Sequence, residues 1–204
     1  MRSQRPRLVL DWDGTVTERD TLDLVLQEFG EAEIYERVEA GLEDGTMTLN
    51  EVIAAEFATV TVPLDEAVAF VVAHARVRPG FAEVARVHRP LVVSSGFREL
   101  IEPVLERERV LDAVELRANR VEARPEGWRV RFRVSEPCEV CGEPCKRADL
   151  PAGEIVYAGD SHSDYCAALA ADRVFAIGGL ARWLRRRGVA FTPLTDFRAL
   201  ASEL

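Results

Sequence analysis

The chain has 204 residues and a formal net charge of −9, from 26 basic and 35 acidic side chains. This acidic balance argues against nucleic-acid binding, because proteins that bind nucleic acids usually carry an excess of cations. The length allows one domain or one domain with an insertion, and 48% hydrophobic with 30% charged residues is the composition of a soluble globular protein.

No targeting or membrane-spanning segment stands out near the N-terminus. Basic residues lead into an apolar run, Leu8–Leu10, which Asp11 interrupts. This run is too short for a signal peptide or a membrane span. We therefore expect a cytoplasmic protein with no membrane partner, in a compartment where free thiols are the norm.

The first predicted element is a short buried strand over Leu8–Leu10, which ends in the turn DWDG. This turn contains two carboxylates, Asp11 and Asp13, two residues apart. Two anions at this spacing repel each other unless a proton or a cation lies between them. The pair is therefore either an ordinary exposed turn or the start of a site.

The stretch from about Thr21 to Ala75 is predicted to be helical. Its apolar residues recur at helical spacing, and glycine and proline residues divide it into roughly four helices. Asp65 is predicted to be the N-cap of the last helix. Because no strand pattern occurs in this stretch, we interpret it as a small helical insertion.

Strands and helices alternate in the rest of the chain. The predicted strands are Leu91–Val93, Ile155–Tyr157 and Val174–Ile177, with helices at about Phe97–Glu108, Ser163–Ala171 and the arginine-rich segment Arg182–Arg187. Residues 113–134 alternate in part around a turn at Pro125–Gly127, which predicts an antiparallel excursion. The alternation predicts an α/β fold, a parallel sheet with helices on both faces.

Polar side chains follow three of the predicted strands. They are Asp11 and Asp13, Ser94 and Ser95, and Asp160 and Asp164. In parallel α/β sheets, ligands bind outside the carboxyl ends of the strands. One shared site at this edge of the sheet explains all three clusters better than three unrelated turns.

The segments that carry these side chains resemble the four motifs of the haloacid-dehalogenase superfamily of phosphotransferases. The motifs occur in the family's order: DWDGTVT at Asp11–Thr17, VVSSGF at Val92–Phe97, Lys146, and GDSHSD at Gly159–Asp164. The resemblance implies a Rossmann-like, parallel-sheet core formed by residues 1–17 and 78–204. It also implies an inserted helical cap of the C1 type, formed by residues 18–77.

The resemblance further implies a Mg²⁺-dependent phosphatase that works through an aspartyl-phosphate. Asp11 would be the nucleophile, and Asp13 would protonate the leaving alkoxide and then activate water. These roles require one carboxyl group to be ionised and the other protonated at the start. Lys146 would neutralise charge on the phosphoryl group. The implied Mg²⁺ ligands are Asp11, Asp13, Asp160 and Asp164, and the implied phosphate-binding residues are Ser94, Ser95, Gly96 and Lys146.

Four longer segments narrow the resemblance within the phosphoserine-phosphatase-like branch. GTVTERDTLD, RPGF at Arg78–Phe81, CEVCGEPCK and GDSHSDYCAA are similar to segments of the MtnX-like phosphatases of methionine salvage, which act on 2-hydroxy-3-keto-5-methylthiopentenyl-1-phosphate. They also resemble the related phosphocholine and phosphoethanolamine phosphatases. The partner implied is a small phosphorylated metabolite. One alternative is a phosphoserine phosphatase. The other is a non-catalytic protein with a phosphate-binding or regulatory role, which retains the site without turnover.

The four cysteines form a separate pattern. Cys138, Cys141 and Cys145 are close in sequence and Cys166 is distant, so a structural Zn²⁺ site requires the fold to bring Cys166 back. The three residues between Cys141 and Cys145 depart from paired C-x2-C knuckles. This departure favours the alternative that the thiols pack the loop that presents Lys146. A disulfide is not expected in the cytoplasm.

Overall fold

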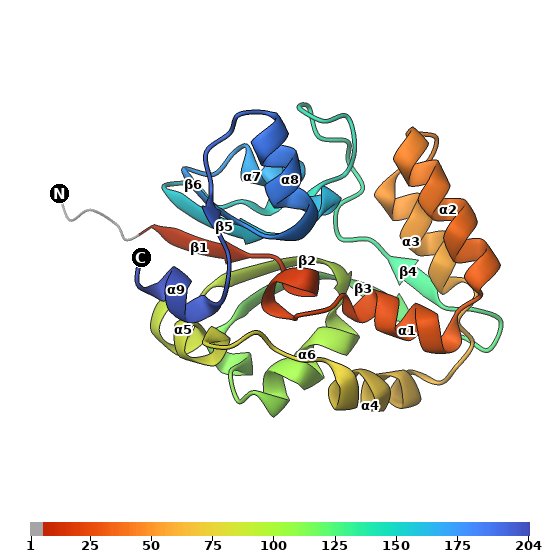
Figure 1. The fold of residues 1–204 in the computed structure, drawn as a ribbon. Coiled ribbons are helices and arrows are strands. Elements are labelled where there is room, and N and C mark those ends of the chain that lie inside the picture. Colours follow the sequence, from red (N-terminus) through yellow and green to blue (C-terminus); the bar gives the residue numbers. More distant parts are fainter. Residues whose placement is uncertain (1–5) are drawn as a thin grey trace.

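A computed structural model of the chain describes residues 6–204. The strands in this part are β1 (Arg7–Leu10), β2 (Leu91–Phe97), β3 (Glu115–Glu122), β4 (Arg129–Arg131), β5 (Ile155–Gly159), β6 (Arg173–Ala176) and β7 (Thr192–Pro193). They form one sheet in the order β4-β3-β2-β1-β5-β6-β7 (Figure 1). Neighbouring strands are parallel except β3 and β4, which are antiparallel. The predicted α/β fold is confirmed.

Both faces of the sheet are buried, and this explains why its central strands are continuous apolar runs. In β1, Leu8 and Leu10 belong to the larger hydrophobic core, while Val9 belongs to a second core on the opposite face. Side chains alternate between the faces along a strand, so β2 divides in the same way. Val92 lies in the larger core and Val93 in the smaller one.

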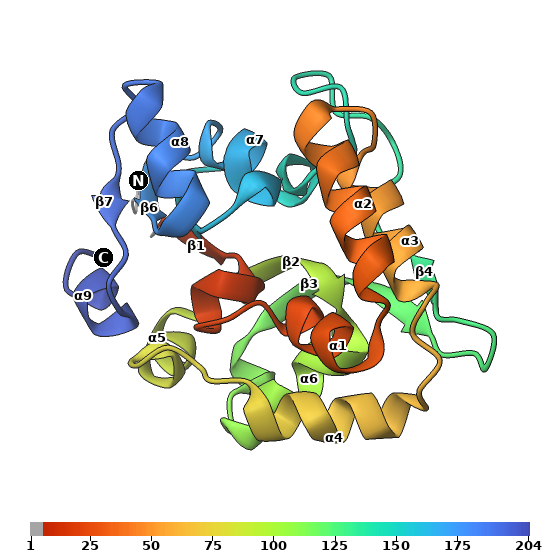
Figure 2. The ribbon, with the colours of Figure 1, turned by 45° about the vertical axis from the view of Figure 1, so that its right-hand side comes forward.

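Helices cover both faces of the sheet (Figures 1 and 2). Those that follow the predicted insertion are α5 (Phe81–His88), α6 (Arg98–Arg107), α7 (Tyr165–Ala168), α8 (Gly178–Arg186) and α9 (Phe197–Ala201). Side chains of α5, α6 and α9 pack in the larger core, and those of α7 and α8 pack in the smaller core. Within residues 6–204, no helix is both long enough and apolar enough to cross a membrane.

The predicted helical stretch forms α1 (Thr21–Phe29), α2 (Ala32–Asp44), α3 (Leu49–Phe57) and α4 (Leu64–His74). Local signals set several of their ends. The Asp20 side chain caps α1 by accepting hydrogen bonds from two backbone N–H groups of its first turn. Helix α2 ends at Gly45, which has a left-handed φ of 75°. Thr48 and Glu51 form a capping box at the start of α3.

The prediction that Asp65 caps α4 is wrong. The helix begins one residue earlier, at Leu64, and its N-cap residue is Pro63, which makes no side-chain hydrogen bond to the helix. Leu64 packs against the larger core, so the burial of this side chain places the first turn before Asp65. Asp65 lies inside that turn, where a negative charge interacts favourably with the helix dipole.

The four helices of this stretch lie in two places. Helices α2 and α3 pack on each other and stand beyond the ends of the central strands, as Figure 1 shows. Helix α4 packs against α6, and α1 packs against α4, so both helices contribute to the larger core. The boundary between a core domain and a cap domain at residues 17/18 and 77/78 stays a prediction.

The fold departs from the predicted elements mainly at the sheet edges. The antiparallel turn after β3 was predicted, but β3 also pairs with β2 and extends the parallel sheet. The helix predicted over Ser163–Ala171 is a 3-10 turn, His162–Asp164, followed by the short α7. Strand pairing depends on segments far apart in the chain, so the local pattern does not specify it.

Candidate active site

The direction in which successive strands are added to the sheet reverses at β1. The chain runs outward through β2 and β3 on one side and later through β5, β6 and β7 on the other. In open α/β sheets, ligands bind outside the carboxyl ends of the strands at such a switch point. Asp11 directly follows β1, and its N–H donates to the carbonyl of Ala158 on β5 at 2.9 Å. Asp160 directly follows β5. Two of the predicted polar clusters therefore meet at the switch point.

A tight turn over Trp12–Val16 follows Asp11 and positions its carboxylate. Gly14 has a φ of 72°, and a Cβ at this position would overlap the carboxylate of Asp160, so both the conformation and the space require glycine. The Thr15 hydroxyl donates to Oδ2 of Asp11 at 3.0 Å. The turn thus fixes Asp11 and leaves room for Asp160 beside it.

Asp13 lies two residues after Asp11 but has different partners. Its Oδ1 accepts hydrogen bonds from the backbone N–H of Thr21 at 2.8 Å and from the Thr21 hydroxyl. Its Oδ2 accepts a long hydrogen bond of 3.4 Å from the Ser94 hydroxyl. Burial and, second, the charge of Asp20 raise the pKa of Asp13 to about 7, against the hydrogen bonds from Thr21. Asp13 can therefore gain and lose a proton near neutral pH.

Lys146 joins Asp11 to Asp164 in the interior. Its side chain is buried, and its ammonium group donates to Oδ1 of Asp11 and, at 2.8 Å, to Oδ1 of Asp164. Asp164 also accepts hydrogen bonds from the Tyr157 hydroxyl at 2.6 Å and from the N–H of Asp160 at 2.8 Å. Burial acts to lower the pKa of Lys146, but the charges of Asp11 and Asp164 outweigh it and raise the pKa. Lys146 is therefore a fixed cation between two carboxylates.

Three carboxylates converge at this point. One carboxylate oxygen from each of Asp11, Asp160 and Asp164 lies within 4.8 Å of the other two. Burial, followed by the neighbouring carboxylates, raises the pKa of Asp11 to about 7 and that of Asp160 to about 9. Oδ1 of Asp160 is buried and has no hydrogen-bond partner in the described part of the chain. One lysine does not balance this charge, so the oxygen donors and the unmet charge fit a hard divalent cation such as Mg²⁺.

The end of β2 faces these carboxylates. Ser94 is buried, and its Oγ accepts a hydrogen bond from the N–H of Gly96 at 2.8 Å. A Cβ on Gly96 would come within 2.8 Å of Oδ2 of Asp13, so the close approach of the two segments requires glycine. Ser95 lines the same cavity as Lys146. The fold therefore brings the predicted phosphate-binding residues together, beside the predicted metal ligands.

The sequence pattern assigns no role to two residues that hold the site in place. The Arg78 guanidinium donates to the carbonyls of Thr15 and Gly14, each at 3.0 Å. The Asn119 side-chain amide donates to the carbonyl of Ser95 at 2.7 Å. These contacts join residues 63, 64 and 24 positions apart, and local spacing carries no signal for them.

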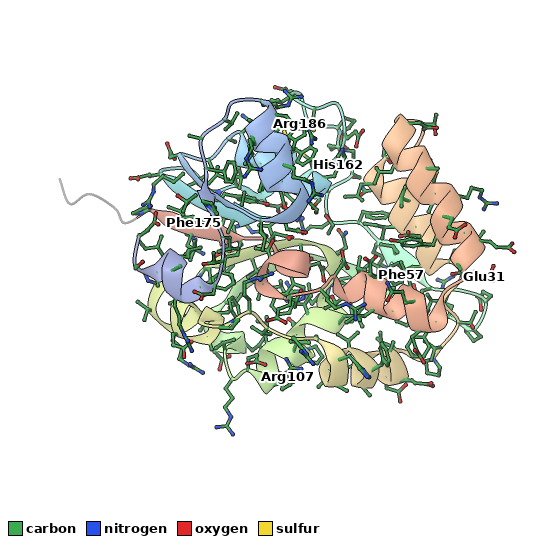
Figure 3. All side chains as sticks on the ribbon, viewed as in Figure 1. Glu31, Phe57, Arg107, His162, Phe175 and Arg186 are labelled. Carbon is green, nitrogen blue, oxygen red and sulfur yellow. The ribbon has the colours of Figure 1, made fainter. Side chains whose placement is uncertain are left out.

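A cavity of about 250 Å³ opens between the carboxylates and helices α1 to α3. His162 lines it and lies between α8 and the α2–α3 pair in Figure 3. A second cavity of about 570 Å³ adjoins the first and shares part of its lining, including Ser95 and Lys146. The apolar wall of the smaller cavity is formed by Leu22, Leu26, Leu42, Leu49, Val52 and Ile53.

The fold also brings Cys166 back to the other three cysteines. The four sulfur atoms lie within 4.8 Å of one another, and all four cysteines are free thiols. The condition that the sequence set for a Cys₄ site is therefore met. Cys145 directly precedes Lys146, and Cys141, Cys145 and Cys166 line the larger cavity.

A family model described as haloacid dehalogenase-like hydrolase matches residues 8–169. The chain belongs to this family. Its sequence is 25% identical to a 2-hydroxy-3-keto-5-methylthiopentenyl-1-phosphate phosphatase of Exiguobacterium sibiricum, over 97% of this chain and 95% of that protein. A protein of the same name from Bacillus cereus is 26% identical, over 95% of this chain and 93% of its own length.

Solved structures with the same fold include phosphoserine phosphatases. A substrate-bound phosphoserine phosphatase complex has a TM-score of 0.72 at 16% identity, covering 99% of this chain and all of that one. A phospho-aspartyl intermediate analogue of phosphoserine phosphatase has a TM-score of 0.71 at 16% identity, covering 98% of this chain. At this identity the likeness shows the fold. The predicted haloacid-dehalogenase fold and the assignment to the hydrolases are thus confirmed.

Proposed function

We propose that the protein is a Mg²⁺-dependent phosphomonoesterase that hydrolyses a small phosphorylated metabolite through an aspartyl-phosphate. The observation that carries this proposal is the convergence of Asp11, Asp160 and Asp164 around a buried carboxylate oxygen that no described residue satisfies. The phosphatase names of the relatives that align over most of the chain support the same reaction class.

Each residue near this convergence has a separate part in holding the ion and the phosphoryl group. Asp11, Asp160 and Asp164 would hold Mg²⁺ through their carboxylates, and Asp13 through its backbone carbonyl. When bound, the ion offsets negative charge on the phosphoryl oxygens. Lys146, fixed between two carboxylates, adds a second positive charge on the same side.

The reaction has two steps. In the first, a carboxylate oxygen of Asp11 attacks phosphorus, the bond from phosphorus to the leaving oxygen breaks, and an acyl phosphate forms on Asp11. Asp13 donates its proton to the leaving alkoxide, a role that its pKa of about 7 supports. In the second step, Asp13 takes a proton from water as the water oxygen attacks phosphorus. Inorganic phosphate leaves, and the Asp11 carboxylate is restored. Ser94 would hold a phosphoryl oxygen throughout.

The cavity wall supports a leaving group with an apolar portion. Its apolar side chains come from α1, α2 and α3, opposite the carboxylates. Within residues 6–204, the basic residues that line this cavity are Lys146 and His162, and Lys146 already serves two carboxylates. The carboxylate of phosphoserine would therefore find no lysine or arginine there, among the described residues, that is free of other ion pairs. The wall therefore favours the methylthio-bearing substrate named for the curated relatives over phosphoserine.

The nucleophile assignment is tested with Asp11→Asn. This variant should lose Mg²⁺-dependent hydrolysis of an aryl phosphate by a factor on the order of 10⁴ or more, because no acyl phosphate can form. The matched control is Asp112→Asn, an exposed aspartate of the 3-10 helix Leu111–Ala113, which should retain full activity. Full activity in a folded Asp11→Asn variant would overturn the proposal, and so would a wild-type protein that binds phosphate without turnover.

The substrate is tested with three phosphate esters compared by kcat/KM. They are phosphoserine, phosphocholine and 2-hydroxy-3-keto-5-methylthiopentenyl-1-phosphate. The last should be the best substrate if the apolar wall selects the leaving group. Preference for phosphocholine would instead assign selection to the acidic side chains that line the cavity, Asp20, Asp23 and Glu56. Preference for phosphoserine would contradict the argument from the wall.

A further inference from the structure

The four cysteines form a cluster that the proposed reaction does not use. Cys138, Cys141 and Cys145 lie on the loop between β4 and the 3-10 helix Lys146–Asp149, and Cys166 lies on α7. The cluster contains all four cysteines of the chain. Cys166 is buried while Cys141 is exposed, so shared burial in an apolar core does not explain why the four meet.

The spacing of the sulfur atoms matches one metal ion with four thiolate ligands. A tetrahedral zinc ion with Zn–S bonds of about 2.3 Å places its sulfurs about 3.8 Å apart. The Sγ atoms of Cys138 and Cys166 are 3.8 Å apart, and all four Sγ atoms lie within 4.8 Å of one another. A disulfide would need about 2.05 Å, so this is not the geometry of paired cysteines.

The backbone of the loop presents two of these sulfurs in the manner of a zinc knuckle. The N–H of Val140 donates to Sγ of Cys138 at 3.4 Å, which stabilises a thiolate at that position. The N–H of Gly142 donates to the carbonyl of Cys138 at 2.8 Å and closes the turn. Gly142 has a φ of 79° with open space around it, so the turn requires glycine for its conformation alone. Cys141 is thereby turned toward the side of Cys138.

Core packing of Phe132 and hydrogen bonds of Arg133 and Val134 hold the start of the loop, but no helix or strand supports the part that carries the cysteines. Between the end of β4 and Lys146, 14 residues (132–145) contain no helix or strand. Loops of this length without secondary structure are uncommon in compact domains. Val140, near its tip, is 61% exposed and adds no core packing. A metal ion that joins three of its side chains to α7 would supply the missing cross-link.

Three arginines lie near the cluster. A zinc ion with four thiolates carries a net negative charge. Arg133 and Arg187 line the same cavity as three of the cysteines, and the Arg147 guanidinium donates to the carbonyl of Cys166 at 3.5 Å. These cations suit an anionic centre, although Arg133 also pairs with Asp149 and Glu143 lines the same cavity.

We propose that Cys138, Cys141, Cys145 and Cys166 bind a structural Zn²⁺ ion that holds Lys146 in the active site. Cys145 directly precedes Lys146, and Cys166 is two residues after Asp164. The ion therefore joins the two segments whose side chains form the Lys146–Asp164 ion pair. Zinc binding does not depend on the proposed phosphatase function, whereas the role assigned to Lys146 rests on it.

Metal analysis of the full-length protein, purified from medium without added zinc, tests the site directly. Inductively coupled plasma mass spectrometry should find about one zinc per chain. Replacement of the zinc by Co²⁺ should give the visible absorption of a tetrahedral cobalt thiolate centre. A metal-free protein with four titratable thiols would overturn the proposal, and so would stoichiometric iron in place of zinc.

Three loop variants separate the ligands from their surroundings. Cys138→Ser should lose the zinc. Cys141→His should retain it, because imidazole nitrogen is also a zinc ligand. Ser135→Ala, an exposed position of the same loop, should retain both zinc and activity. Zinc retained in Cys138→Ser, or lost in Ser135→Ala, would contradict the ligand set.

The positioning role predicts that kcat follows zinc content. With Mg²⁺ in excess, kcat for an aryl phosphate should fall about tenfold in Cys138→Ser and remain near wild type in Cys141→His, with little change in KM. An unchanged kcat in folded, zinc-free protein would overturn the positioning role. Zinc without any phosphatase activity in the wild type would overturn the proposed function and leave the zinc site standing. Phosphatase activity in a wild-type protein that contains no zinc would overturn the zinc site and leave the proposed function standing.

Discussion

Two clusters of metal-ligating side chains lie side by side, and the fold supports them in opposite ways. In the carboxylate cluster, Asp11 and Asp160 directly follow β1 and β5, so the sheet brings them together, and Asp164 lies in the 3-10 helix His162–Asp164 that follows β5. The cysteine cluster joins Cys166 on α7 to a loop without helix or strand. In the first cluster, the proposed Mg²⁺ would relieve repulsion between carboxylates that the fold brings together. In the second, the proposed Zn²⁺ would order a loop that has no helix or strand.

The largest expected effect is that of Lys146→Met, which breaks the balance of charge in the carboxylate cluster. The substitution leaves Asp11 and Asp164 buried without their cation, and losing one partner of a buried ion pair costs about 3–5 kcal/mol. Urea denaturation without Mg²⁺ should show this loss of unfolding free energy, and phosphatase activity should fall with it.

The control for this prediction is Arg131→Met, which removes an ion pair with Glu122 at the surface. The Arg131 side chain is 70% exposed, so the loss should stay below about 1 kcal/mol. Equal losses for Lys146→Met and Arg131→Met would mean that the buried pair is screened as well as a surface pair is.

Removing each metal separately should distinguish the two clusters. After zinc is removed by a chelator, a glutamate-specific protease should cleave the loop after the exposed residue Glu139 on the order of tenfold faster, because local unfolding opens the backbone. Dialysis into Mg²⁺-free buffer should leave this rate unchanged. Equal cleavage rates with and without zinc would contradict the inference that zinc orders this loop.

Gly14→Ala should have an intermediate effect, because it disturbs the carboxylate cluster through its backbone. Gly14 has a φ of 72°, and the added methyl group would also overlap the Asp160 carboxylate. The matched control is Gly45→Ala, which has a φ of 75° and open space. Gly45→Ala should cost about 1 kcal/mol from backbone strain alone. The loss of unfolding free energy, measured by denaturation, should be larger for Gly14→Ala than for Gly45→Ala, and the difference reports the contact with Asp160. Equal losses would show that the Asp160 side chain moves away from the added methyl group.

The smallest expected effect is the pH dependence of stability without metal. The pKa values of Asp11 and Asp13 are raised from 3.8 to about 7, and that of Asp160 to about 9, with burial as the main cause. Between the ordinary and the raised values, the folded state binds more protons than the unfolded state, so stability falls as pH rises through this window.

The Tm of metal-free protein should therefore be a few degrees lower at about pH 8.5 than at about pH 6. Mg²⁺ should raise Tm more at the higher pH, where the carboxylates are ionised. Asp160→Asn, which removes one of these carboxyl groups, should flatten the dependence. A Tm that rises with pH in metal-free protein would contradict the raised pKa values.

Features that depend on neighbours in the chain were predictable from sequence. The apolar run before Asp11 predicts β1, and Gly30, Gly45 and Pro63 lie between the observed helices, although Gly41 lies within α2. The start of α4, which the sequence predicts wrongly, shows the limit of local signals. Asp65 has the chemistry of an N-cap, but Leu64 packs in the core and moves the start of the helix. Tertiary burial outweighs a local cap here.

The sequence alone therefore determined the α/β class, the polar clusters at the strand ends and the family they resemble, because period and spacing reflect contacts within a few residues. Only the tertiary structure decided which distant groups meet. Lys146 reaches Asp11 across 135 residues, and Cys166 reaches Cys138 across 28. Such contacts follow from the order of strands in the sheet and the path of a loop, and no local pattern encodes either. For this reason the zinc site, disfavoured by its spacing in the sequence, is favoured once the four sulfurs are placed in space.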